Sequence, residues 1–230
     1  MLATEPTNSG GRIEPFSIKD CALVALATGK KARTLQEFRS EFERIEVASI
    51  YHHFWGGLLQ PRFEEREFNN DFASWMGHSI HDLTLAERLA AVSPTEFTDL
   101  AALRREILDL IDARLDEAEH LLWTPATRQF EFVCSQIVVF DTEQRLHEPE
   151  DLAGAAANFS TSSIFYHFID ARRRTDSGRD DFSDWLAAFG PGFEALRKQL
   201  AGIDPYFGNL SELRDELARS FMSYFGGSSP

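Results

Sequence analysis

The stretch Ser49-Ile50-Tyr51-His52-His53-Phe54 is repeated in the second half of the chain as Ser163-Ile164-Phe165-Tyr166-His167-Phe168. The match continues backward without a gap as far as Phe16 and Phe130, and it continues forward with two small shifts. A long repeat that is present only twice indicates a duplicated domain and not a solenoid. The sequence therefore predicts two homologous repeats.

The composition and the extent of the match give the predicted domain bounds. A chain of 230 residues with 43% hydrophobic and 12% aromatic residues is sufficient for a hydrophobic core. Residues 1–15 are rich in Thr, Asn, Ser, Gly and Pro and lack periodicity, which predicts a flexible tail. The repeats are predicted at residues 16–122 and 130–225. Because the linker is short, we expect them to pack as one body with pseudo-twofold symmetry.

Each repeat begins with a predicted strand. The apolar runs Phe16–Thr28 and Phe130–Phe140 are rich in residues that favour strands. Because a lone strand has open edges, we expect the two strands to pair with each other or each with a short hairpin. Thr34 followed by Glu37 forms a capping box, which predicts a helix over about residues 35–44. About four or five helices follow in each repeat, so the predicted fold class is α+β and predominantly α-helical.

The charge of the chain limits its partners. A net charge of −14 and a pI near 4.9 repel phosphate backbones and anionic lipids, so we expect neither nucleic acid nor membrane as a partner. The sequence contains no apolar run long enough to span a bilayer and no recognisable secretory signal. We therefore expect a cytoplasmic protein.

One polar couple is kept in both repeats: His53 with Asp71 recurs as His167 with Asp181. The spacing places each histidine on the apolar face of a helix, and each aspartate stands where a helix N-cap is expected. The couple is either a catalytic dyad kept twice or a buried neutral histidine bonded to a capping carboxylate. We favour structural couples, because no serine or cysteine has a recognisable nucleophile elbow or neighbouring base.

A second group of histidines lies in the first repeat only. His78, His81 and Asp82 follow helical spacing and, with His53, form a candidate metal site. The pattern resembles the sparse ligand set of helical metal-dependent phosphohydrolases. The alternative is a solvated helix end or a capped turn. The second repeat has no His or Asp at the positions that correspond to His78, His81 and Asp82.

Three consecutive arginines, Arg172, Arg173 and Arg174, form a cationic segment in an acidic chain. Such a patch could receive a phosphate, a sugar nucleotide or an acidic partner surface. The alternative is that the arginines pair with nearby acids such as Asp181. Neither predicted strand is followed by a glycine-rich phosphate loop.

Several motifs along the chain are those of a known family. They are Phe16-x-Ile18-Lys19-Asp20-Cys21, the paired Ser-Ile-aromatic-x-His-Phe segments, Asn70-Asp71-Phe72-x-x-Trp75, Leu85-Ala86-Glu87-Arg88-Leu89 and Ile169-Asp170-Ala171-Arg172-Arg173-Arg174. Over about residues 14–225 the chain resembles a bacterial and archaeal family of unknown function that usually occurs as a tandem duplication. The resemblance implies an association with carbohydrate-active enzymes, chiefly glycosyltransferases, and it implies no catalytic residue.

Together these patterns predict a non-catalytic binding or regulatory module. We expect it to act on a protein partner, such as a glycosyltransferase or another carbohydrate-active enzyme, and to need no cofactor. Two alternatives stay open: a metal-dependent phosphohydrolase-like enzyme that uses the histidines of the first repeat, and a small-ligand binder with a site at the interface between the repeats. The sequence leaves the oligomeric state open.

Overall fold

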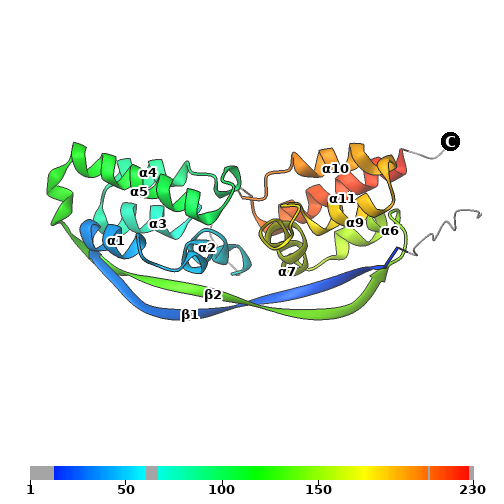
Figure 1. The fold of residues 1–230 in the computed structure, drawn as a ribbon, viewed down its shortest axis with the longest axis horizontal. Helices are drawn as coiled ribbons and strands as arrows, with labels where there is room; N and C mark the ends of the chain where they lie inside the picture. The colour runs from blue at the N-terminus through cyan, green and yellow to red at the C-terminus, as the bar shows by residue number, and fades with distance from the viewer. Residues whose placement is uncertain (1–12, 61–66, 207, 228–230) are drawn as a thin grey trace, which may run out of the picture. The chain divides into compact units, whose positions relative to one another are not determined.

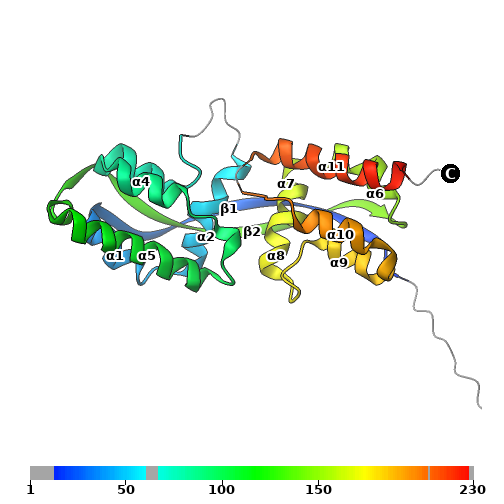
Figure 2. The ribbon, with the colours of Figure 1, turned by 90° about the horizontal axis from the view of Figure 1, so that it is seen from above.

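The computed structural model describes residues 13–60, 67–206 and 208–227 of the chain. The predicted flexible tail of residues 1–15 falls almost wholly outside these ranges. The described chain is mostly helical and contains one two-stranded sheet, formed by β1 (Phe16–Thr34) and β2 (Pro125–Leu146). The strands run antiparallel, and within each part of the chain the helices lie on one face of them (Figure 1 and Figure 2).

Each strand is followed by a group of helices. After β1 come α1 (Leu35–Phe42), α2 (Val47–Trp55), α3 (Asp71–Trp75), α4 (Leu83–Ala90) and α5 (Leu100–Glu117). After β2 come α6 (Asp151–Ala155), α7 (Thr161–Ile164), α8 (Ala171–Arg174), α9 (Asp181–Ala188), α10 (Glu194–Ala201) and α11 (Leu210–Gly226). Wider π-helical turns, Met76–Ile80 and Phe165–Asp170, continue α3 and α7.

The start of α1 confirms Thr34 as the predicted N-cap, whereas the Glu37 side chain binds the residue before it. The Thr34 hydroxyl accepts a hydrogen bond from the Glu37 N–H at 3.1 Å, and the Glu37 carboxylate accepts one from the Arg33 N–H at 2.7 Å. The first bond satisfies one of the amides that a helix start leaves without an intrahelical partner, and the second joins the Glu37 side chain to the end of β1. The helix ends at Phe42, whose side chain is buried.

Two threonine side chains fix the register of the strands. The Thr28 hydroxyl on β1 donates to the carbonyl of Phe132 on β2 at 2.6 Å. The Thr142 hydroxyl on β2 donates to the carbonyl of Ile18 on β1 at the same distance. A slip by one residue would break both bonds and turn the apolar side chains to the opposite face.

The chain forms two compact units, and each unit is assembled from separate segments. Unit 1 consists of the described residues within Met1–Asp20, Asp141–Ile203 and Arg214–Pro230, and unit 2 of those within Cys21–Phe140 and Asp204–Leu213. The beginning of β1 and the end of β2 therefore belong to unit 1. The remainder of both strands belongs to unit 2.

An aromatic core holds the strands to the helices in unit 2. Phe38 of α1 lies 5.1 Å from Phe130 and 5.3 Å from Phe132 of β2, measured between ring centroids. Phe72 of α3 lies 5.6 Å from Phe130. Offset and edge-to-face contacts at these distances stabilise a core beyond the burial of apolar area alone.

Unit 1 contains a corresponding core. Phe16 of β1 lies 5.2 Å from Phe182 and 5.3 Å from Trp185, both on α9. Phe182 in turn lies 5.7 Å from Phe221 of α11. The strand that begins the first repeat is therefore buried against helices of the second.

The predicted arrangement of the fold is wrong. We expected two homologous repeats, each with its own strand or hairpin and its own helices, packed with pseudo-twofold symmetry. The compact units are not successive halves of the chain. Phe130 packs on helices of the first repeat, and Phe16 packs on a helix of the second. A single strand cannot satisfy its own edges, so β1 and β2 pair with each other and each lies partly on the helices of the other repeat.

Candidate functional site

The two histidines kept in both repeats are buried. His53 lies on α2 with 4% of its surface exposed, and His167 lies on the π-helical turn after α7 with 3% exposed. The His53 ring is 4.8 Å from the ring of Phe130. The His167 ring is 4.9 Å from the ring of Phe16. Polar groups in such aromatic surroundings require hydrogen-bond partners.

Each histidine has a carboxylate on one side of its ring. His53 Nδ1 lies 2.9 Å from Asp71 Oδ2, and His167 Nδ1 lies 2.7 Å from Asp181 Oδ2. The structure thus brings together the residues of both couples that the sequence repeats. Both aspartates are the first residues of their helices, where a negative charge is favourable to the helix dipole.

The other ring nitrogen of each histidine binds the backbone of a strand. His53 Nε2 accepts the N–H of Val133 on β2 at 3.1 Å, and His167 Nε2 accepts the N–H of Lys19 on β1 at 2.8 Å. A two-stranded sheet turns half of its amides outward, where they lack a strand partner. Each histidine therefore joins a strand edge to the start of a helix.

These contacts fix the chemical form of both rings. A backbone N–H can only donate, so Nε2 of each ring must be the acceptor and the ring hydrogen must lie on Nδ1. That hydrogen is donated to the aspartate. Neither ring keeps a lone pair for a reacting proton or for a metal ion while the strand is bound. The geometry suits a structural bond and does not suit a general base.

The helix caps lie one residue earlier than the sequence suggested. We expected Asp71 and Asp181 to be N-caps, but Asn70 accepts the N–H of Ala73 and Asp180 accepts that of Ser183, both at 2.8 Å. The aspartates that follow the caps are thereby able to bond the imidazoles. Burial raises the pKa of Asp180, against the hydrogen bonds from Ser183.

A further histidine, which the sequence analysis did not single out, lies beside the couple in unit 2. His52 Nδ1 is hydrogen-bonded to the hydroxyl of Ser135 on β2. Burial and the neighbouring His53 lower the pKa of His52. Only its position next to His53 could have indicated its role, since Tyr166 stands at the corresponding place in the second repeat.

Among the described residues, His52, His53 and Asp71 are close enough to share a metal ion, with one ligand atom from each within 4.8 Å of the others. The donor set does not fit a metal. His53 Nε2 is bonded to the Val133 N–H, and its Nδ1 carries the hydrogen that binds Asp71. A metal at Nδ1 would require an imidazolate or the loss of the bond to the strand.

The predicted metal residues His53, His78, His81 and Asp82 do not converge. His78 Nε2 bonds the exposed Glu67 at 2.7 Å. His81 is exposed and has a left-handed backbone, with φ of 62°. Asp82 is the N-cap of α4 and forms an ion pair of 2.8 Å with Arg114. Burial raises the pKa of Asp82, but hydrogen bonds from Arg114 and from the N–H of Leu85 hold it below its usual value.

The three predicted patch arginines are engaged within unit 1. Arg172 lies over the Phe168 ring at 4.5 Å, and Arg173 bonds Asp170 at 2.8 Å. Arg174 bonds Asp181 Oδ2 at 2.6 Å, the oxygen that also binds His167. Arg174 therefore binds the aspartate of the His167 couple.

These observations define a helical protein whose two strands are tied to its helices by buried histidine and aspartate couples. The chain belongs to DUF5752, a family of unknown function, whose sequence profile matches residues 13–222. This confirms the resemblance to an uncharacterised family, whereas an association with carbohydrate-active enzymes is not shown.

A solved structure has a similar fold. OrfY from Thermoproteus tenax is 27% identical in sequence, with a TM-score of 0.78 over 90% of this chain and 94% of that chain. No curated protein sequence matches the chain. No helix in the described ranges has the length and apolar character needed to cross a membrane.

Proposed function

We propose that the protein is a non-catalytic binding or regulatory module that acts on a partner enzyme, such as a glycosyltransferase or another carbohydrate-active enzyme. The proposal rests on one observation: both ring nitrogens of His53 and of His167 are hydrogen-bonded within the protein. Each ring uses one nitrogen for an aspartate and the other for a strand amide. The polar residues kept twice in the sequence thus maintain the fold.

The other candidate groups support the same conclusion. Asp82 is bonded to Arg114, and Arg174 is bonded to Asp181. Both are side chains that the sequence suggested for a metal or an anionic ligand. Because each serves an internal ion pair, neither is presented to a substrate in the way that catalysis requires.

The charge of the chain indicates the kind of partner. With a net charge of −14, the protein attracts basic surfaces and repels acidic ones. Electrostatic attraction of this kind increases the rate of association with a basic partner and is weakened by salt. In this proposal the module works in the cytoplasm, beside its partner enzyme.

The test has two parts. The purified protein should not hydrolyse p-nitrophenyl phosphate or p-nitrophenyl glucoside above the level of its His53→Gln variant. A partner identified by mass spectrometry after affinity purification from the native cells should then be purified separately. Its kcat or KM should change when the module is added. Turnover of either substrate that His53→Gln abolishes would contradict the proposal, and so would a partner whose kinetics the module leaves unchanged.

A further inference from the structure

One segment of the sheet carries no charged residue. It consists of residues 21–29 of β1 and residues 132–140 of β2, which we call the uncharged strand pair. All of it belongs to unit 2. In a chain of which 26% is charged, this is a neutral surface bounded by charged residues.

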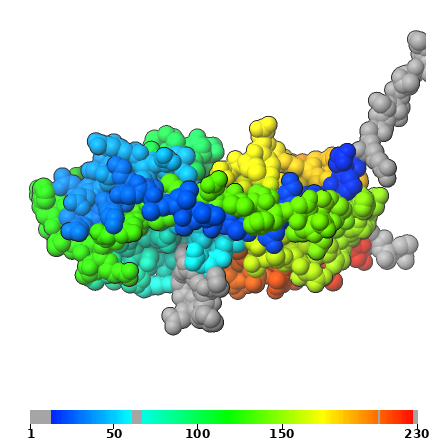
Figure 3. Space-filling model, turned by 90° about the horizontal axis from the view of Figure 1, so that it is seen from below, coloured from blue at the N-terminus to red at the C-terminus, as the bar shows by residue number. Residues whose placement is uncertain are grey.

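The uncharged strand pair exposes large apolar side chains. Five of the nine exposed large hydrophobic residues of the described chain lie in it, with exposed fractions between 39% and 50%. They are Val24, Leu26, Val138, Val139 and Phe140. Figure 3 shows both strands at the molecular surface on the side away from the helices. Alternate residues of a strand share a face, so Val138 and Phe140 lie on one face and Val139 on the other. Exposed apolar side chains gathered on two neighbouring strands mark interaction sites, and exposed strands readily pair with another chain.

We propose that a second copy of this chain binds to the uncharged strand pair. In a twofold-symmetric dimer the same patch packs on its own copy, so a charge close to the symmetry axis would meet the same charge. An uncharged apolar patch avoids that repulsion and is complementary to itself.

The charges that border the strand pair are also compatible with a second copy. Lys31 forms an ion pair with Glu131 at 3.0 Å beyond one end. Asp141 forms an ion pair with Arg145 at 2.7 Å beyond the other end. Because each pair is neutral, the border adds little net charge against a second copy.

The net charge gives the dimer a distinctive dependence on salt. Two copies of charge −14 repel each other at long range. Salt screens this repulsion over a distance that falls from about 10 Å at 0.1 M to about 3 Å at 1 M ionic strength. Apolar contacts are not weakened by salt. Association should therefore strengthen as salt is added, which is the reverse of what attraction between opposite charges would give.

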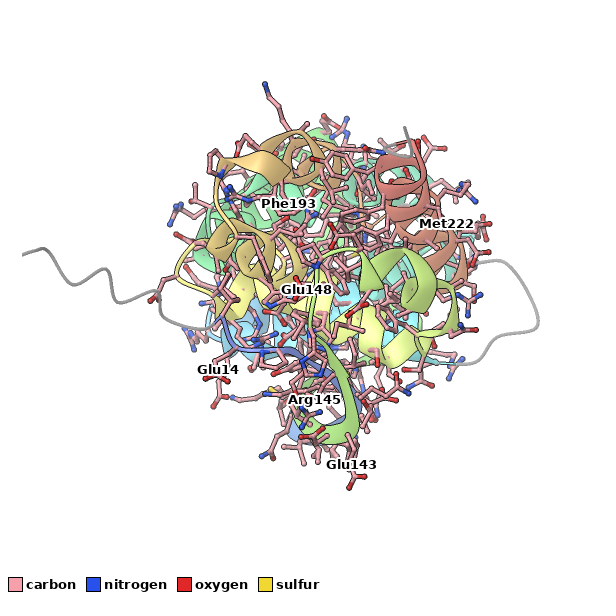
Figure 4. The ribbon with its side chains drawn as sticks, turned by 90° about the vertical axis from the view of Figure 1, so that its right-hand side faces the viewer. Glu14, Glu143, Arg145, Glu148, Phe193 and Met222 are labelled. Atoms are coloured by element: carbon pink, nitrogen blue, oxygen red, sulfur yellow. The ribbon has the colours of Figure 1, made fainter. Side chains whose placement is uncertain are left out.

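The experiment measures the molar mass of the full chain by sedimentation equilibrium from micromolar to millimolar concentration. The monomer has a mass of 26.1 kDa. Phe140→Asp places a charge in the strand pair, and Val24→Asp does so from the other strand. Met222→Asp is the matched control, because Met222 is 58% exposed and lies on α11, away from the strand residues Glu143 and Arg145 (Figure 4).

The wild type should form a dimer, and added salt should strengthen it. Either strand variant should raise the dimer dissociation constant at least about tenfold, whereas Met222→Asp should change it less than about twofold. Circular dichroism and the melting temperature check that each variant is folded. A wild type that stays monomeric at millimolar concentration overturns the proposal. A dimer that all three variants weaken equally, or that salt dissociates, also overturns it.

Discussion

Replacing His53 with alanine should destabilise unit 2, because it removes two hydrogen bonds and a buried ring at once. The lost bonds are those to Asp71 at 2.9 Å and to the N–H of Val133 at 3.1 Å. Each contributes about 1 kcal/mol, and a buried amide left without an acceptor costs about 1–3 kcal/mol. Together these contributions, with part of the ring volume left as a cavity, should lower the free energy of unfolding by roughly 3–5 kcal/mol. His78→Ala is the control, because that side chain is exposed and should change stability by less than about 0.5 kcal/mol.

The assay for this prediction has a global and a local measurement. Urea unfolding followed by circular dichroism gives the free energy of unfolding. Hydrogen exchange of the Val133 amide tests the strand bond itself, because loss of its acceptor should speed exchange. The Lys19 amide, which His167 accepts, should keep its protection against local opening in His53→Ala. An unchanged free energy of unfolding, or an unchanged rate at Val133, would refute the structural role of the couple.

Three further predictions concern caps and ion pairs. Arg114→Leu should lower the free energy of unfolding by roughly 1–3 kcal/mol at neutral pH, because the Asp82 carboxylate loses its partner. Since the folded-state pKa of Asp82 is lowered, its contribution is present above the unfolded value of about 3.9 and is lost as pH falls through the folded value, which melting curves at acid pH will show. Asp180→Asn should raise the free energy of unfolding at pH 7, because burial disfavours the charge of Asp180 and an asparagine, Asn70, serves as the corresponding cap of α3. Because the pKa of Asp180 is raised in the folded state, the wild type loses stability as pH rises through that pKa. The stability gained by Asp180→Asn should therefore disappear below the pKa of the aspartate in the unfolded chain, which thermal melts at two pH values will test. Thr34→Ala should lower the free energy of unfolding, measured in urea, by about 1 kcal/mol, because the N-cap bond to the Glu37 N–H is lost.

The local structure was predictable where a few neighbouring residues determine it. Thr34 and Glu37 stand three residues apart, and their bonds depend only on the backbone of residues 33–37. The helix starts near Asp71 and Asp181 were predictable for the same reason. The cap was misplaced by one residue, because Asn70 and Asp180 are equally good capping residues and the sequence does not show which side chain turns to the backbone.

The sequence did not show that each strand would pack partly on the helices of the other repeat. Both strands carry phenylalanine side chains suited to packing on helices, and the sequence does not show which helices each strand covers. The contact of His52 with Ser135 depends on this choice, since β2 must lie beside α2 before the two side chains can meet. The sequence of one repeat alone does not show on which helices its strand will pack.

The packing of each strand on the helices of the other repeat gives both histidine couples a role. His53 belongs to the first repeat, but the amide that it accepts, that of Val133, lies in the second. His167 belongs to the second repeat and accepts the amide of Lys19 in the first. Each couple therefore joins sequences from both repeats, and losing one would leave an amide of the shared sheet without its acceptor. A protein with two copies of a catalytic site could lose one copy and keep its activity. The sheet, in contrast, is bonded to the helices by His53 at Val133 and by His167 at Lys19, and it needs both bonds. Retention of both couples is therefore what a structural role requires.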